Sequence, residues 1–124
     1  MKTITMRVLV RFLCVAILSV LSHQVMAWAA IAVDGYHGVR GGWSYDYPDA
    51  YGAQQRALNE CGSGCMLLGW IETGCIAFSV DRDPSSSVIG MATSYNRDQA
   101  QNMALQICRS NGGSDCIVRV WACN

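Results

Sequence analysis

The feature that most constrains the fold of this chain is an internal repeat with a spacing of 47 to 51 residues. Residues 28–74 and 75–124 carry the same types of residue in the same order. The matched positions are Ala30/Ala77, Gly42/Gly90, Tyr47/Tyr95, Ala57/Ala104, Cys61/Cys108, Cys65/Cys116 and Trp70/Trp121. A chain that repeats itself in this way predicts two copies of one supersecondary unit.

Each half has the pattern of a strand, a second strand, a helix and a third strand. Apolar runs predict the strands, and small or apolar residues spaced three and four apart predict the helices. The predicted strands span 28–33, 42–47, 66–71, 75–80, 89–95 and 117–122, and the predicted helices span 49–61 and 97–108. This duplicated β-β-α-β repeat predicts an α+β fold stapled by disulfides. We expect one mainly antiparallel sheet with two helices packed on one face, as in ferredoxin-like domains.

The amino terminus has the pattern of a cleavable signal peptide over residues 1–27. Lys2, Arg7 and Arg11 precede an apolar run at 12–21, and small residues follow at 25–27. The apolar run is about half the length that a helix needs to span a bilayer. We therefore expect an exported protein, periplasmic or extracellular, with residues 28–124 as a single domain and no membrane attachment after cleavage.

Seven cysteines are present, and Cys14 lies within the predicted signal peptide. An even number of cysteines in a short exported domain indicates disulfide bonds. Zinc sites favour Cys-x2-Cys pairs or several histidines, which this chain lacks, so we expect no metal and no cofactor. Six cysteines allow fifteen pairings. The end of each helix lies near the start of the next strand, which favours Cys61–Cys65 and Cys108–Cys116 and leaves Cys75–Cys123.

The charged residues argue against nucleic acid as a partner. After residue 27 the chain has no lysine, and six arginines stand against nine acidic residues, a formal charge of −3. A mildly acidic domain with scattered arginines lacks the basic surface that binds phosphate backbones.

The residues also give little support for catalysis, so we expect no enzyme and no catalytic residues. His37 is the one histidine after residue 27, and no serine lies in a Gly-x-Ser-x-Gly motif. Asp34 and Asp81 occupy equivalent strand ends, where capping of a turn explains them more simply than acid–base chemistry. A small hydrolase that uses His37 with an aspartate remains an alternative.

Aromatic residues mark a candidate binding patch in the first half. Trp43, Tyr45 and Tyr47 alternate along one strand and are therefore expected to face one way. Positions shared by both halves, which include Trp43 and Tyr47, are expected to be buried, and Trp70 and Trp121 are expected to be structural. The candidate patch is Tyr36, His37, Arg40, Trp43 and Tyr45. Binding surfaces favour aromatic residues with arginine, but an ordinary half-buried hairpin is the alternative.

Several motifs resemble the domain-of-unknown-function family 4189. They are the segments 28–34 (WAAIAVD), 47–48 (YP), 74–77 (GCIA) and 116–123 (CIVRVWAC), together with Ala53, Ala57-Leu58, Cys61-Gly62 and Cys65. The resemblance covers nearly all of residues 28–124. It implies an exported bacterial protein, and it brings no activity and no catalytic residues.

These observations favour an exported, non-enzymatic module that binds another protein. One such function is that of an inhibitor or immunity protein for a secreted or periplasmic enzyme or toxin. The alternative of another class is a module that binds cell-wall or other carbohydrate through its aromatic face.

Overall fold

The computed structural model describes residues 27–35 and 40–124. In these described residues, six strands and two helices follow one another in the order β-β-α-β and then β-β-α-β. Their bounds are β1 (Trp28–Val33), β2 (Gly41–Tyr47), α2 (Ala50–Cys61), β3 (Met66–Ile71), β4 (Cys75–Asp81), β5 (Ile89–Ser94), α3 (Arg97–Ser110) and β6 (Cys116–Cys123). The fold is therefore α+β. None of the described helices is long and apolar enough to cross a membrane.

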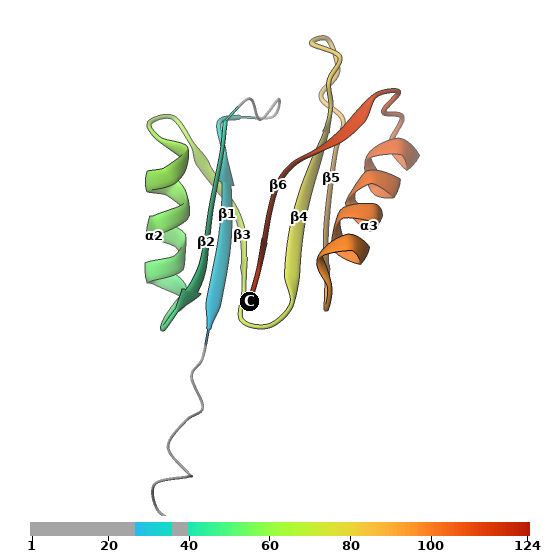
Figure 1. The fold of residues 1–124 in the computed structure, drawn as a ribbon. Helices are drawn as coiled ribbons and strands as arrows, with labels where there is room; N and C mark the ends of the chain where they lie inside the picture. Colours follow the sequence, from blue (N-terminus) through green and yellow to red (C-terminus); the bar gives the residue numbers. More distant parts are fainter. Residues whose placement is uncertain (1–26, 36–39) are drawn as a thin grey trace, which may run out of the picture.

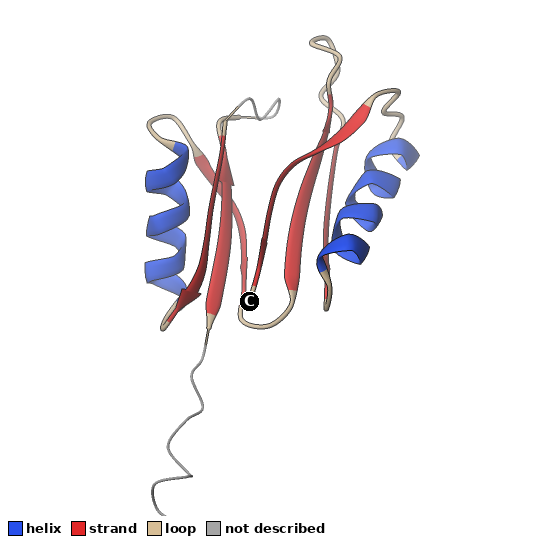
Figure 2. Ribbon diagram, viewed as in Figure 1, coloured by secondary structure: helices blue, strands red, loops and turns tan. Residues whose placement is uncertain are grey.

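The strands form two separate antiparallel sheets, with the orders β2-β1-β3 and β5-β4-β6. The two sheets face each other, α2 covers the outer face of the first, and α3 covers the outer face of the second (Figure 1, Figure 2). The predicted single sheet with both helices on one face is therefore wrong. The reason is that β1 and β4 are apolar on both faces, so each needs a helix on one face and a second sheet on the other.

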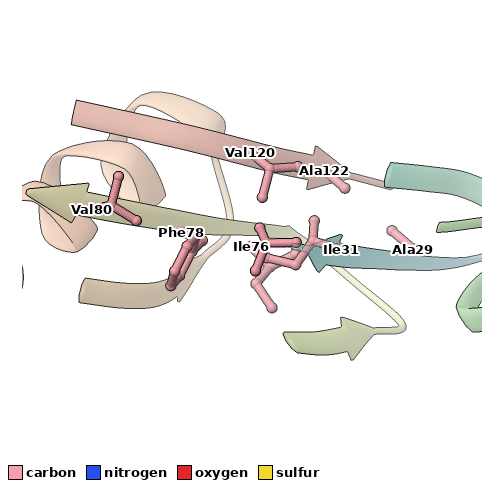
Figure 3. Packing of buried hydrophobic residues seen from close by; sticks show 8 residues of the cluster. Ala29, Ile31, Ile76, Phe78, Val80, Val120 and Ala122 are labelled. Atoms are coloured by element: carbon pink, nitrogen blue, oxygen red, sulfur yellow. The ribbon is translucent and has the colours of Figure 1, made fainter. Parts of the chain in front are cut away.

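The core lies between the sheets. Ile31 from β1, Phe78 from β4 and Val120 from β6 are among the buried side chains that meet there (Figure 3). The full set is Ala29, Ile31, Val33, Ile76, Phe78, Val80, Val120 and Ala122. Burying this apolar surface is the main driving force that joins the two halves.

Each helix lies close to its sheet because small residues fill the interface between them. Ala30 and Ala32 of β1 pack on Ala53 and Ala57 of α2, and alanines fill the matching layer under α3. A Cβ atom at Gly42 would overlap the carbonyl oxygen of Ala57, so the strand and the helix backbone are in contact there.

Buried hydroxyls and capping side chains hold the helices on their sheets. Ser44 Oγ donates to the carbonyl oxygen of Ala53 at 2.7 Å, and Ser79 Oγ donates to that of Ala104 at 2.7 Å. Asp49 accepts from the backbone N–H of Gly52 at 2.6 Å and so caps the start of α2.

Three disulfide bonds cross-link the domain, and they join the pairs favoured from the sequence. Cys61–Cys65 ties the end of α2 to the turn before β3, and Cys108–Cys116 ties α3 to the start of β6. Cys75–Cys123 joins β4 to β6, where the two residues are direct partners in the ladder.

The side chain of Asn124 links the second half to the first. Its Nδ2 lies 2.7, 3.1 and 3.0 Å from the carbonyl oxygens of Ala27, Ile71 and Glu72. Its backbone N–H donates to the carbonyl oxygen of Gly74 at 2.9 Å. These bonds hold the end of β6 against the residue before β1 and the end of β3.

Asn124→Ala is expected to lower the free energy of unfolding by about 1–2 kcal/mol, because three carbonyl groups lose a shared donor. Urea unfolding monitored by circular dichroism measures the change. Asn102→Ala, on the exposed surface of α3, is the matched control and should leave stability unchanged or slightly higher. Equal effects of the two substitutions would contradict the assigned role of Asn124.

Candidate functional site

The structure separates the members of the predicted patch. Tyr36 and His37 lie outside the described residues, so the patch and the proposed use of His37 are not tested there. Arg40, Trp43 and Tyr45 are described, and only Trp43 and Tyr45 line a common groove.

Arg40 is held by neighbouring residues and takes no part in the groove. Its backbone N–H and its Nε donate to the carboxylate of Asp34 at 2.8 and 3.0 Å. Its Nη2 donates to the carbonyl oxygen of Ser63 at 2.8 Å. Arg40 therefore connects the end of β1 to the loop closed by the Cys61–Cys65 disulfide, which is a structural role.

The three aromatic residues of β2 do not all face one way. Two residues of β2, Tyr45 and Asp46, stand opposite one residue of β1, so the strand contains a β-bulge. Asp46 has a φ of 59°, in the left-handed region. The bulge turns Tyr47 toward α2, where it packs on the alanine layer, while Trp43 and Tyr45 stay outside that layer.

The predicted burial of Trp43 is also wrong. Trp43 is 53% exposed and Tyr45 is 59% exposed. In β2 it is Gly42 and Ser44 that face α2, and Trp43 points to the opposite side of an edge strand. Among the described residues no further strand covers Trp43 there, because the facing sheet ends at β6.

A groove of about 690 Å³ lies between the two edge strands β2 and β6. It is lined by Gly41, Trp43, Tyr45, Arg119, Val120, Trp121, Ala122 and Cys123. Two close approaches join β2 to the chain around the end of β6. A Cβ at Gly41 would lie 3.1 Å from Cβ of Val120, and the N–H of Asp46 donates to Oδ1 of Asn124 at 3.4 Å. The groove is therefore short, which suits a side chain or a short segment better than a whole added strand.

Arg119 is the charged residue among those that line this groove, and it was not among the site residues predicted from the sequence. Between Phe78 and Ser79 of β4 the register of β6 shifts by one, so Arg119 is an extra, bulged residue. Its Nε is buried without a hydrogen-bond partner among the described residues. The corresponding position in the first half is Leu68, which is bulged in the same way and packs against the core. The change from leucine to arginine between these two positions could have marked Arg119 as a site residue.

Trp121 borders the groove on the outer edge of β6. It is 39% exposed, and the guanidinium carbon of Arg97 lies 5.3 Å from the centre of its ring. This distance fits a cation–π contact. Trp121 thus links the start of α3 to β6, although it also presents part of its ring to solvent.

Asp34 and Asp81, at equivalent strand ends in the two halves, accept hydrogen bonds from backbone N–H groups of loops. Asp81 is buried and accepts from the backbone N–H groups of Asp83 at 3.1 Å and Ser114 at 3.2 Å. The bond from Asp83 is the main cause that lowers the pKa of Asp81 below its usual value. The backbone N–H of Arg40, followed by its side chain, lowers the pKa of Asp34 in the same way.

These lowered pKa values predict that acid destabilises the fold. A carboxylate with a lower pKa in the folded state adds stability above its unfolded pKa of about 3.9, and this stability is lost as the pH falls through the folded pKa. The free energy of unfolding should therefore fall from about pH 4 downward. Urea unfolding at a series of pH values measures this, and the double substitution Asp34→Asn, Asp81→Asn should flatten the decline. If the free energy of unfolding of the double variant falls with pH as steeply as that of wild type, the assigned role of Asp34 and Asp81 is contradicted.

A family model described as a domain of unknown function (DUF4189) matches residues 28–123, which include every described helix and strand. No curated protein and no solved structure gives a significant match.

Proposed function

The chain belongs to the DUF4189 family, and from the geometry of the β2–β6 groove we propose that it is a binding module that holds a segment of another protein. The observation that carries this proposal is the pair of exposed aromatic side chains, Trp43 and Tyr45, which line the groove together with Arg119. Aromatic residues and arginine are the residue types that dominate binding energy at protein interfaces.

The lining of the groove supports binding over catalysis. Among its described residues there is no histidine, carboxylate, serine or lysine, and Cys123 is in a disulfide. General acid–base and nucleophilic catalysis most often use such groups, and Tyr45 is the one described lining residue with a titratable hydroxyl. A groove of about 690 Å³ that lacks them supports recognition of a partner, for example the inhibition of a secreted enzyme or toxin.

The site of action in this proposal is outside the cytoplasm. The three disulfides form and persist in oxidising compartments, and the amino-terminal pattern of residues 1–27 is that of a signal for export. We place the mature domain, residues 28–124, in the periplasm or outside the cell.

We also propose that the two halves, residues 28–74 and 75–124, arose by duplication of one unit. The equivalent glycines support this, since a Cβ at Gly42 or Gly90 would meet the helix backbone at equivalent positions. The equivalent bulges at Leu68 and Arg119 support it as well. The two copies then differ at the binding groove, which Arg119 lines, whereas Leu68 at the corresponding position packs against the core.

Substitution of the aromatic residues tests the binding function. The immobilised domain should recover a stoichiometric protein from the extracellular or periplasmic fraction of the source cells, and Trp43→Ala or Tyr45→Ala should abolish the recovery. Tyr51→Ala is the matched control, because Tyr51 is an aromatic residue of α2 that is 71% exposed and does not line the groove. The proposal would be contradicted if Tyr51→Ala reduced the recovery as much as Trp43→Ala does. Repeated failure to recover any protein would contradict it as well.

A carbohydrate is the second candidate ligand, because the exposed rings of Trp43 and Tyr45 offer apolar faces on which a sugar can stack. Retention of the domain on peptidoglycan or on a glycan array, lost in Tyr45→Ala, would favour this candidate over a protein partner.

A further inference from the structure

Arg119 differs from most arginines of the domain in having no acidic partner. Four of the six described arginines make ion pairs with aspartate or glutamate, namely Arg40, Arg56, Arg82 and Arg97. All nine acidic residues of the chain lie in its described part, and none of them pairs with Arg119. Arg109 also lacks an ion pair there, but it lies exposed in the last turn of α3, where a cation is favourable.

The surroundings of Arg119 make this lack of a partner costly. The residue is half-buried in the groove, and its Nε is cut off from solvent without a hydrogen-bond partner in the described chain. A buried donor without an acceptor costs free energy, and a guanidinium carries a charge as well. An anion in the groove offsets the unpaired charge, and a carboxylate matches the forked geometry of the guanidinium. A bond to Nε itself requires the side chain to turn toward the groove, because Nε is closed to solvent.

The residues beside Arg119 are apolar or aromatic. Trp43, Val120 and Trp121 line the groove with it, and no described carboxylate is among the lining residues. The groove thus combines one positive charge with apolar walls, so its complement is a negative charge flanked by apolar side chains. The close approaches of β2 to Val120 and to Asn124 limit the inserted part to a few residues.

We propose that the β2–β6 groove receives an acidic side chain of a partner protein, flanked by apolar residues, and that its carboxylate pairs with Arg119. This inference rests on the proposed function, because it names the chemistry of the segment that the binding module holds. Arg119 is the residue that sets specificity for an acidic segment, and Trp43 and Tyr45 provide the apolar contacts.

Selection from a phage-displayed library of random dodecapeptides tests the inference without knowledge of the partner. The wild-type domain should enrich peptides in which Asp or Glu lies next to aliphatic or aromatic residues. A synthetic copy of an enriched peptide should bind Arg119→Gln roughly 30-fold more weakly than wild type, since a desolvated charge loses its partner. Arg119→Lys should recover part of this loss, and Arg109→Gln should bind as wild type does.

A measurement on the wild-type protein keeps the test independent of variant stability. In a ¹⁵N-labelled sample, the Nε–H signal of Arg119 should move on addition of the acidic peptide and stay in place with the Gln-for-Glu or Asn-for-Asp copy. Enriched peptides that lack an acidic residue and bind Arg119→Gln normally would overturn the inference and leave the binding module standing. If the wild-type domain enriches peptides no more than Trp43→Ala does, both the inference and the proposed binding function are overturned. If the domain binds uronic-acid glycans and no peptide, the proposal of a protein partner is overturned.

Discussion

Replacing Cys75 and Cys123 together by alanine is expected to lower the free energy of unfolding by about 4 kcal/mol. This disulfide closes a loop with a sequence separation of 48 residues, whereas Cys61–Cys65 closes one of 4. The loss of chain entropy in the unfolded state grows with the length of the closed loop, so the expected cost for Cys61–Cys65 is only about 2 kcal/mol.

Urea unfolding of the two double variants measures the difference directly. The comparison is matched, because each variant removes one disulfide and leaves the other two in place. A cost for the short loop equal to or greater than that for the long one would contradict the role of Cys75–Cys123 as the main cross-link. We expect full reduction to unfold the domain, since the three costs add to a large part of the usual stability of a small domain.

Gly42→Ala and Gly90→Ala should each cost about 3 kcal/mol, because the added methyl group overpacks the contact between strand and helix. A Cβ at Gly42 would overlap the carbonyl oxygen of Ala57, and one at Gly90 would overlap that of Ala104. Both atoms belong to helix backbone, which cannot move aside as a flexible side chain can. Relief of the overlap requires the helix to shift away from the alanines that it packs on.

Gly112→Ala separates this effect from the conformational freedom of glycine. Gly112 has a φ of 100°, yet nothing lies within 4 Å of an added Cβ. Its substitution should therefore show only the backbone cost of about 1 kcal/mol. Thermal or urea unfolding of the three variants makes the comparison, and equal costs at all three positions would refute the close approach of helix and strand.

The sequence pattern predicted the order and type of the elements, but not the number of sheets. Local spacing determines where strands and helices form, whereas the pairing of sheets depends on which faces of a strand are apolar. The runs at Ala29–Val33 and Cys75–Val80 are apolar at nearly every position, which indicates strands covered on both faces. A single sheet with helices on one face would have left the other face of β1 and β4 in water.

The candidate site was predicted only in part, because bulges change the face of a side chain. Strict alternation places Trp43, Tyr45 and Tyr47 together, and the bulge at Tyr45–Asp46 removes Tyr47 from that set. A second bulge makes Arg119 an extra residue of β6. The sequence shows no consistent mark of either bulge, although the contrast between Leu68 and Arg119 at matched positions was visible. The charge of Arg40 suggested a binding role, but its partner Asp34 satisfies it.

Photo-cross-linking in the source cells tests the central claim, that the β2–β6 groove is the binding site, most directly. Tyr45 is replaced by p-benzoylphenylalanine, and Tyr51 on α2 is replaced in the same way as the control. We expect illumination to join the domain to one discrete protein from position 45 and not from position 51, with the adduct mapping to an acidic segment of that protein. The absence of an adduct at position 45, or the same adducts from both positions, would contradict it.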